Sequence, residues 1–324
     1  MNSCCKNQHD KNKCENLNHP KVVRTYINSN VQYIADTDWY NDITINPWGI
    51  ISLVEKCGCR NVYWVANNKS NKLGKYFHDG ELLEEVNTSE RPTGLVYNYT
   101  NFYKQYKIIV VTEVGTIEGL IIDNNNYPAG NTEIIINNNN NAIYTGVDLT
   151  KKRLYVCNFA SGYVEIYDRD FNFIKVFTDD ALVNSGYHPY NVSVNGKYVY
   201  VTFARKIPEA IQALTGIGYG YVDKFNREGE LLYRFISRDP LNAPWGLEFS
   251  KCNKYLYVGN NGDGKINIFD FCTGEFIGPI MDKNCNPIQI GNLWGLSLYS
   301  DKLAFTSGMD DNNNGLIGYL EILK

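Results

Sequence analysis

The chain has 324 residues, of which 44% are hydrophobic and 14% aromatic, and its formal net charge is -4. This length is sufficient for a large buried core in one or two domains. The balanced charge gives no basic surface for nucleic acid and no polybasic membrane anchor. No apolar stretch approaches the roughly 18 residues that a membrane-spanning helix requires.

The N-terminal residues 1–20 are polar and contain Cys4, Cys5 and Cys14. A secretory hydrophobic region is absent from them, and the cysteine spacing matches no standard zinc template. We therefore expect a disordered, Cys-containing tail over 1–20. Without a signal peptide, the expected location is the cytoplasm or the interior of a viral particle.

A short phrase recurs six times at intervals typical of propeller blades. Three copies are strong and three are weaker; they read Asn46-Pro47-Trp48-Gly49-Ile50, Arg91-Pro92-Thr93-Gly94-Leu95, Ile143-Tyr144-Thr145-Gly146-Val147, His188-Pro189-Tyr190-Asn191-Val192, Ala243-Pro244-Trp245-Gly246-Leu247 and Asn292-Leu293-Trp294-Gly295-Leu296. Each copy predicts the first strand of one repeat.

A second apolar run follows every copy, rich in the Val, Tyr and Ile that favour strands. These runs are Val62–Ala66, Ile108–Thr112, Leu154–Cys157, Tyr198–Thr202, Tyr255–Gly259 and Leu303–Thr306. Cys157 stands inside such a run, where a small buried thiol is the ordinary case. A third strand opens with Gly-x-Ile or Gly-x-Val wording, and the fourth follows a Gly-containing turn.

Four short strands, repeated six times without a helical pattern between them, predict an all-β fold. The expected domain is a six-bladed β-propeller over 21–324, with four-stranded antiparallel blades. The last blade ends at Lys324 with three strands of its own. We expect the segment around Val22–Ile27 to supply the fourth, so that an N-terminal strand closes the ring and covers an open edge.

The phrases around Trp48, Trp245 and Trp294, together with Gly259-Asn260-Asn261-Gly262-Asp263-Gly264 and Phe305-Thr306-Ser307-Gly308, resemble a largely bacterial family of uncharacterised propeller proteins. The similarity runs from about Tyr26 to the C-terminus. That family often carries secretion or surface-sorting signals, which this chain lacks, and the resemblance implies no established activity. More distantly, the repeats resemble NHL-type blades, which mostly serve as binding platforms.

An aromatic group is expected at one mouth of the central channel. In a propeller blade the first strand starts on the face where the second strand ends, so the residues at these positions converge there. Trp48, Trp245 and Trp294 hold this place, with Tyr190 in the fourth blade. Such rings bind glycans, cations or protein side chains. The alternative is that each Trp packs as core between neighbouring blades.

A polar group is expected at the same mouth, formed by Asn67, Glu113, Asn158 and Asn260. Amide and carboxylate oxygens suit calcium, and some six-bladed hydrolases hold a catalytic calcium in the channel. The alternative is that these side chains cap the turn into the third strand through backbone N–H groups. A single carboxylate is little charge for a tight calcium site.

The leading functional hypothesis is a non-enzymatic binding or structural platform without a cofactor or a catalytic residue. Its partner would be a protein or a glycan on the Trp-lined face, and not nucleic acid. One alternative is a calcium-dependent hydrolase acting on lactones or esters. Another is a virion or particle-associated structural protein, because the Asn-rich composition is typical of the AT-rich genomes of some protists and large DNA viruses.

Overall fold

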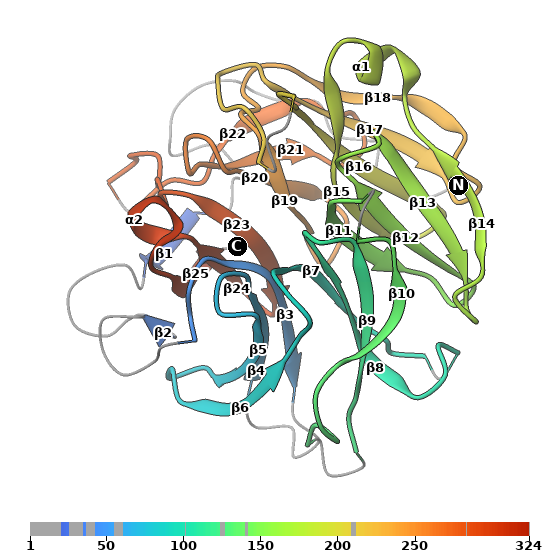
Figure 1. Ribbon diagram of the computed structural model, residues 1–324. Coiled ribbons are helices and arrows are strands. Elements are labelled where there is room, and N and C mark those ends of the chain that lie inside the picture. Colours follow the sequence, from blue (N-terminus) through green and yellow to red (C-terminus); the bar gives the residue numbers. More distant parts are fainter. Residues whose placement is uncertain are drawn as a thin grey trace.

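The computed structural model describes residues 21–25, 35–36, 43–54, 61–100, 102–123, 127–139, 142–208, 212–282 and 284–323. Over these residues the chain is all-β, and its antiparallel sheets stand as six blades around a ring (Figure 1). The predicted six-bladed β-propeller is confirmed. The expected tail over 1–20 lies outside the described residues.

Each of the first five blades contains four strands, which pair in sequence order from the channel outward. Blade one contains β3 (Pro47–Val54), β4 (Asn61–Asn67), β5 (Lys72–Phe77) and β6 (Leu82–Asn87), and blade two contains β7 (Pro92–Tyr97), β8 (Tyr106–Thr112), β9 (Thr116–Ile121) and β10 (Glu133–Asn137). Blade three contains β11 (Tyr144–Leu149), β12 (Arg153–Asn158), β13 (Tyr163–Asp168) and β14 (Phe173–Phe177). Blade four contains β15 (Tyr187–Asn195), β16 (Tyr198–Arg205), β17 (Gly220–Asn226) and β18 (Leu231–Ser237), and blade five contains β19 (Pro244–Phe249), β20 (Tyr255–Asn260), β21 (Ile266–Asp270) and β22 (Phe276–Pro279).

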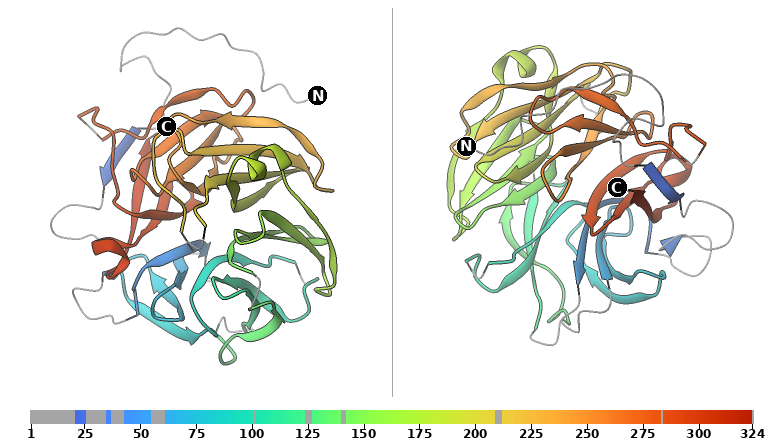
Figure 2. Two further views of the ribbon diagram at one scale, coloured as in Figure 1. Left: turned by 45° about the horizontal axis from the view of Figure 1, so that its top comes forward. Right: turned by 180° about the vertical axis from the view of Figure 1, so that it is seen from behind.

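The sixth blade combines both ends of the chain. Its strands are β23 (Leu293–Tyr299), β24 (Lys302–Ser307) and β25 (Leu316–Leu323), and β1 (Lys21–Thr25) pairs with β25 on the outside. The two-residue β2 (Ala35–Asp36) pairs with the start of β25. Both views of Figure 2 show β1, in blue, beside the red β25. Whether this strand is needed to close the ring stays a prediction.

Two short helices lie outside the blades. Helix α1 (Asp180–Asn184) follows β14, and its N-cap Asp179 accepts hydrogen bonds from the backbone N–H groups of Ala181 and Leu182, which satisfies donors that the first turn leaves free. Helix α2 (Met309–Asn312) joins β24 to β25. No helix in the described part of the chain is long and apolar enough to span a membrane.

The recurring phrase is explained by the geometry of the innermost strands. The first residue of the phrase has a left-handed conformation in blades one and five, where Asn46 has φ 48° and Ala243 has φ 47°. The glycine permits close approach between neighbouring blades. A Cβ added to Gly246 would lie 2.8 Å from the Trp294 carbonyl oxygen, and one added to Gly295 would lie 2.5 Å from that of Trp48. A side chain at these positions would push the inner strands apart.

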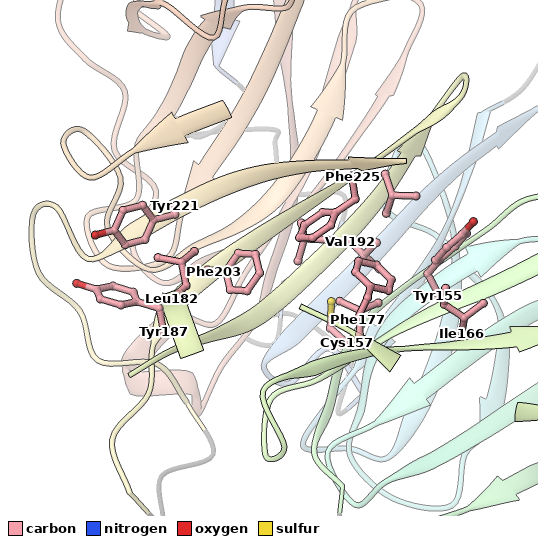
Figure 3. Close-up of a cluster of buried hydrophobic side chains, with 13 residues drawn as sticks. Tyr155, Cys157, Ile166, Phe177, Leu182, Tyr187, Val192, Phe203, Tyr221 and Phe225 are labelled. Carbon is pink, nitrogen blue, oxygen red and sulfur yellow. The ribbon is translucent and has the colours of Figure 1, made fainter. Parts of the chain in front are cut away.

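The core consists of clusters between neighbouring blades. Figure 3 shows the one between blades three and four, where Phe177 of β14 and Phe225 of β17 meet edge to face at 4.9 Å. Cys157 of β12 is fully buried in this cluster, as its sequence pattern predicted. Burial raises the pKa of this thiol well above its ordinary value. Cys157 is therefore a packing residue.

Candidate functional site

Aromatic side chains from five blades meet at the mouth of the channel where the first strands begin. Trp48 stacks on Trp294, with ring centroids 3.7 Å apart at an angle of 14°. Trp245 meets the two rings edge-on, at 6.0 Å and 6.1 Å. Tyr190 lies 6.4 Å from Trp48, and Phe159 lies 4.8 Å from Tyr190. We call Trp48, Phe159, Tyr190, Trp245 and Trp294 the aromatic plug.

The aromatic plug fills the mouth of the channel, so its side chains do not line an open cavity. Trp48, Tyr190 and Trp294 have no exposed surface, and Trp245 is 4% exposed. The Trp245 indole Nε1 donates to the Thr145 carbonyl oxygen at 3.2 Å, which joins blade five to blade three. The structure therefore brings the four predicted aromatic residues together, but it packs their faces against one another. Their role in ligand binding stays a prediction.

The three asparagines of the predicted polar group hold equivalent positions. Asn67, Asn158 and Asn260 each end the second strand of their blade, opposite the first residue of the innermost strand. In blade two this position belongs to Thr112. Glu113 comes one residue later, so it is not the structural equivalent of the three asparagines.

Asn158 caps the turn into the third strand. Its Oδ1 accepts hydrogen bonds from the backbone N–H groups of Ala160 at 3.1 Å and Ser161 at 3.2 Å. Its Nδ2 donates to the Glu165 carboxylate at 2.8 Å. The whole carboxamide is therefore committed inside blade three, as the turn-capping alternative requires.

The other two asparagines also make local contacts. Asn67 donates to the Tyr76 hydroxyl at 3.2 Å, and Asn260 donates to the Pro240 carbonyl at 2.8 Å. Their Oδ1 atoms are buried and have no hydrogen-bond partner in the described part of the chain. Each amide nitrogen is thus held within its own blade or the segment entering it, and calcium binding at the predicted residues stays a prediction. Among the described residues no three or more His, Cys, Asp or Glu side chains form a metal-binding group.

Glu113 lies in a different environment from the asparagines. Its side chain is 5% exposed, and its Oε2 lies 3.8 Å from the guanidinium of the half-exposed Arg91. Burial raises the pKa of Glu113 to about 7, although a hydrogen bond with Asn68 and the charges of Arg91 and Lys69 act in the opposite direction. Its charge also acts on Tyr190 of the plug. Glu113 is therefore a buried acid beside the mouth.

Below the plug the channel contains a cavity of about 150 Å³ lined by the innermost strands of all six blades. Two acids, Asp148 of blade three and Glu248 of blade five, line it. Burial raises the pKa of Asp148 to about 6 and that of Glu248 to about 7, and the charge of Asp148 contributes to the shift of Glu248. Partly buried carboxylates with raised pKa values are candidates for functional groups.

Both acids connect neighbouring blades in the same way. Asp148 accepts from the backbone N–H groups of Leu149 and Val194, at 2.7 Å and 2.6 Å. Glu248 accepts from those of Phe249 and Leu298, at 3.0 Å and 3.1 Å. Each carboxylate thus joins its own strand to the innermost strand of the next blade. Both carboxylates therefore have a structural role, since their hydrogen bonds connect neighbouring blades.

The sequence analysis did not single out Asp148 and Glu248. The available signal was their position two residues after the glycine of the phrase, where blades one and two have the apolar Ile51 and Val96. An acid at an inner-strand position is unusual. The presence of an acid there is explained by the backbone N–H groups of the next blade, to which its carboxylate is hydrogen-bonded.

An apolar strip lies on the outer strands of blades three and four. Figure 1 shows β14 and β18 at the outer edge of the ring. Six large apolar side chains on them are between 42% and 59% exposed, and we call them the rim strip: Phe173, Ile174, Val176, Leu231, Leu232 and Tyr233. Both strands are edge strands, so their outer backbone groups have no partner strand in the described sheets.

The rim strip rests on a fixed support between the two blades. Arg234 of β18 lies 3.1 Å from the carboxylate of the fully buried Asp223, and it also pairs with Asp179, the N-cap of α1. Burial acts to raise the pKa of Asp179, but hydrogen bonds with Asp223 and the Leu182 backbone, together with the charge of Arg234, hold it below its ordinary value. Burial, together with the neighbouring Asp179, raises the pKa of Asp223 to about 7. The ion pairs tie β18 to the segment that follows β14.

Solved structures similar to this chain share its fold at low sequence identity. A crystal structure of a nidogen/laminin complex has a TM-score of 0.56 at 12% identity, covering 74% of this chain and 84% of that one. A catalytically inactive virginiamycin B lyase from Staphylococcus aureus, with quinupristin, has the same TM-score and identity and covers 87% and 86%. The β-propeller domain of Cps50 (Swd1) from Myceliophteria thermophila has a TM-score of 0.53 at 12% identity, covering 84% and 82%.

Sequence comparison finds viral relatives, whereas no family model matches the chain. Uncharacterized protein L690 of Acanthamoeba polyphaga mimivirus is 28% identical over 312 residues, covering 85% of this chain and 80% of the relative. Uncharacterized protein R648 of the same virus is 30% identical over 307 residues, covering 85% and 74%. The chain therefore belongs to the same family as uncharacterized protein R648 of this mimivirus.

Proposed function

We propose that the chain is a non-enzymatic binding platform that contacts a protein partner through the rim strip. The observation that carries the proposal is the set of six exposed apolar side chains on the outermost strands of two neighbouring blades. A concentration of exposed large apolar side chains favours an interaction site, since isolated proteins rarely leave large apolar patches uncovered. Aromatic residues are also enriched in interfaces.

The kind of partner follows from the chemistry of the strip. Four of its six members are aliphatic, namely Ile174, Val176, Leu231 and Leu232. Aliphatic groups with few hydrogen-bonding neighbours favour an apolar protein surface over a glycan, which needs planar faces and polar groups. The unpaired edges of β14 and β18 add backbone groups that an extended segment can meet. A protein is therefore the proposed partner class.

The rim is a better contact surface than the channel mouth. A ligand that uses the faces of Trp48 and Trp294 would first have to separate two stacked and buried rings. The rim strip needs no such rearrangement, and Arg234 holds its support in place. A structural neighbour solved in a nidogen/laminin complex supports a place for this fold in protein assemblies.

The viral relatives favour a particle as the setting of this platform. A rigid disk with an adhesive rim suits lateral packing in a virion or a similar particle. Mass spectrometry of purified particles, from infected cells that express the gene, tests this setting. We expect the chain to co-purify with the particles after washing at high salt. Its absence from them would contradict the particle setting but would leave the proposed rim-strip interface untouched.

The rim itself is tested with a double charge variant. Ile174→Glu with Leu232→Glu places two carboxylates on the strip at positions that are 46% and 43% exposed. The matched control, Ile217→Glu with Phe276→Glu, makes the same charge change at exposed apolar positions elsewhere. Retention of partner proteins from cell extract on each immobilised protein is then quantified.

We expect the rim variant to retain at least about tenfold less of the partners than the wild type and the control, because buried unpaired charges at an interface cost more than about 1.4 kcal/mol. Equal retention by the three proteins would contradict the proposal. The thermal unfolding of each variant is recorded to show that it is folded.

A further inference from the structure

We propose that Arg205 and Arg238 of blade four bind a phosphate monoester group together with the hydroxyl of Tyr187. Arg205 is the last residue of β16, Tyr187 is the first of β15, and Arg238 directly follows β18. In an antiparallel blade these three positions lie at one end, which is the end at the channel mouth. We call the three residues the arginine site. The rim strip is separate from it, because its members on β18, residues 231–233, lie in the first half of that strand.

The strand pairing of blade four brings the three side chains together. Arg205 lies directly opposite Tyr187 in the ladder between β15 and β16, and the side chains of such a pair point to the same face of the sheet. Tyr221 of β17 packs edge to face on Tyr187, with ring centroids 4.8 Å apart. The Cζ of Arg238 lies 6.0 Å from the centre of the Tyr221 ring. The two guanidinium groups therefore belong to one cluster around these two rings.

The two tyrosines direct their polar ends out of the core. Both are 6% exposed, and Figure 3 shows their hydroxyls pointing to the same side, away from Phe203. Burial raises the pKa of Tyr187, whereas the charges of Arg205 and Arg238 act in the opposite direction. The Tyr187 hydroxyl keeps its proton near neutral pH and has no hydrogen-bond partner among the described residues. It is therefore a donor that lies between two cations.

The two arginines keep their N–H groups available. The Cζ of Arg205 lies 4.7 Å from the centre of the Tyr219 ring, and stacking on a ring fixes a guanidinium without using the donors at its edge. Arg205 is half-buried and Arg238 is exposed. In the part of the chain that the structure describes, neither side chain donates a hydrogen bond or forms an ion pair, and this includes Asp239, the next residue after Arg238.

A third arginine of the same blade shows the contrast. The Cζ of Arg234 lies 4.8 Å from the centre of the Tyr221 ring, but this guanidinium pairs with the carboxylates of Asp223 and Asp179. The charge of Arg234 is thus compensated within the chain. The charges of Arg205 and Arg238 are not, so an anion from outside the described residues can pair with both.

Two uncompensated cations and a hydroxyl donor favour an anion with two charges and several acceptor oxygens. A phosphate monoester carries a charge of about −1.5 to −2 at pH 7 and has three strong acceptor oxygens. A carboxylate or a sulfate monoester carries a single negative charge. Guanidinium groups also match phosphate in geometry, because they donate two parallel hydrogen bonds to it. A phosphate monoester is therefore the ligand class that fits the arginine site.

The test compares two ligands of similar shape and different charge. Phenyl phosphate is mainly a dianion at about pH 7.5, whereas phenyl sulfate is a monoanion. Calorimetric titration of the full chain, in a buffer without phosphate, should show saturable binding of phenyl phosphate that is at least about fivefold tighter than that of phenyl sulfate. Equal affinities, or no saturable binding of phenyl phosphate, would overturn the proposal.

Two variants assign the binding to the arginine site. Arg238→Gln and Arg205→Gln should each weaken phenyl phosphate about tenfold. The matched control is Arg169→Gln, which removes a guanidinium 5.9 Å from the Phe102 ring, in the turn between β13 and β14, and should leave the affinity unchanged. An equal loss in the control would show non-specific attraction and contradict the proposal. If Arg205→Gln does not fold, the exposed Arg238→Gln and the control decide the question.

A phosphate monoester can belong to a phosphorylated protein side chain or to a small metabolite. N-acetyl-O-phosphoserine amide and glucose 6-phosphate represent these two sources, and the tighter ligand identifies the source. Similar affinities would show that the site recognises the phosphate group alone, and binding of neither would contradict the proposal. None of these titrations involves the rim strip, so the arginine site and the proposed platform can fail separately.

Discussion

Trp294 carries much of the packing at the channel mouth, because it contacts Trp48, Trp245 and Tyr190 and is fully buried. We expect Trp294→Ala to lower the free energy of unfolding by about 3–5 kcal/mol, the usual cost of removing a buried Trp. Urea unfolding followed by circular dichroism measures it. Tyr99→Ala removes an exposed ring and should change stability by less than about 0.5 kcal/mol. A similar small loss for Trp294→Ala would show that the plug is not a packed core.

Glu113 should make stability depend on pH. Its pKa is raised from 4.5 to about 7 by burial, so the folded chain holds the proton more tightly than the unfolded chain does. The resulting stabilisation is fully present below about pH 4.5 and is lost as the pH rises through about 7. Glu113→Gln removes this dependence and should raise stability at about pH 8 by up to about 3 kcal/mol.

Melting temperatures between about pH 5 and pH 8 test this expectation. The control is Glu81→Gln, at an exposed position. Parallel pH profiles for the wild type and Glu113→Gln would contradict the assigned role of Glu113.

Calcium should not bind at the predicted polar group. The carboxamide of Asn158 is committed to turn amides and to Glu165, and Glu113 is offset by one position from the asparagines. We expect no heat of binding in calorimetric titration and no rise in melting temperature with calcium. Saturable binding that Glu113→Gln abolishes would restore the calcium-dependent hydrolase as the better account.

At the scale of single residues, the sequence predicted where the side chains lie in the blades better than it predicted their burial and contacts. The repeat located Trp48, Trp245 and Trp294 because equivalent residues recur at equivalent places. Their burial depends on contacts between non-adjacent blades, such as the one from Trp245 to Thr145, which no local pattern contains. The offset of Glu113 was missed because Thr112 carries no amide to mark the equivalent position.

At the scale of elements, the structure places β1 against β25 with Lys21 opposite Leu323 and Thr25 opposite Leu320. Deleting residues up to Pro20 should leave stability almost unchanged, because the strand is retained. Deleting residues up to Asn30 should lower the melting temperature and cause aggregation, because an edge is opened. Each ladder hydrogen bond lost costs about 0.5–1.5 kcal/mol.

Differential scanning calorimetry and light scattering of the two truncated chains measure this difference. Equal melting temperatures would show that β1 contributes nothing to closure. The short β2, which pairs with Leu316 and Ile317, is present in both truncated chains and serves as an internal constant.

Strands were the elements that the sequence predicted best, because apolar alternation and Gly-containing turns repeat in every blade. The left-handed conformation of the phrase's first residue was not foreseen. Ala243 adopts it at φ 47°, although alanine gives no sequence indication of a left-handed conformation. Helix α1 likewise depends on its Asp179 cap, which also pairs with Arg234 of the next blade.

At the scale of the whole molecule, the six-fold repeat was enough to predict the ring. The location of the exposed apolar rim strip was not predictable from the repeat, because the exposure of β14 and β18 depends on what the rest of the chain leaves uncovered. Their residues, such as Ile174 and Leu232, are individually ordinary strand residues. Only the folded ring shows that the outermost strands of blades three and four expose them.

The most direct test of the account is hydrogen exchange of the chain alone and in complex with the partner that it retains. We predict slower exchange on binding in β14 (Phe173–Phe177) and β18 (Leu231–Ser237), because a partner covers their outer edges. Protection confined to the channel mouth, at the starts of β3, β19 and β23, with no change in β14 and β18, would contradict it.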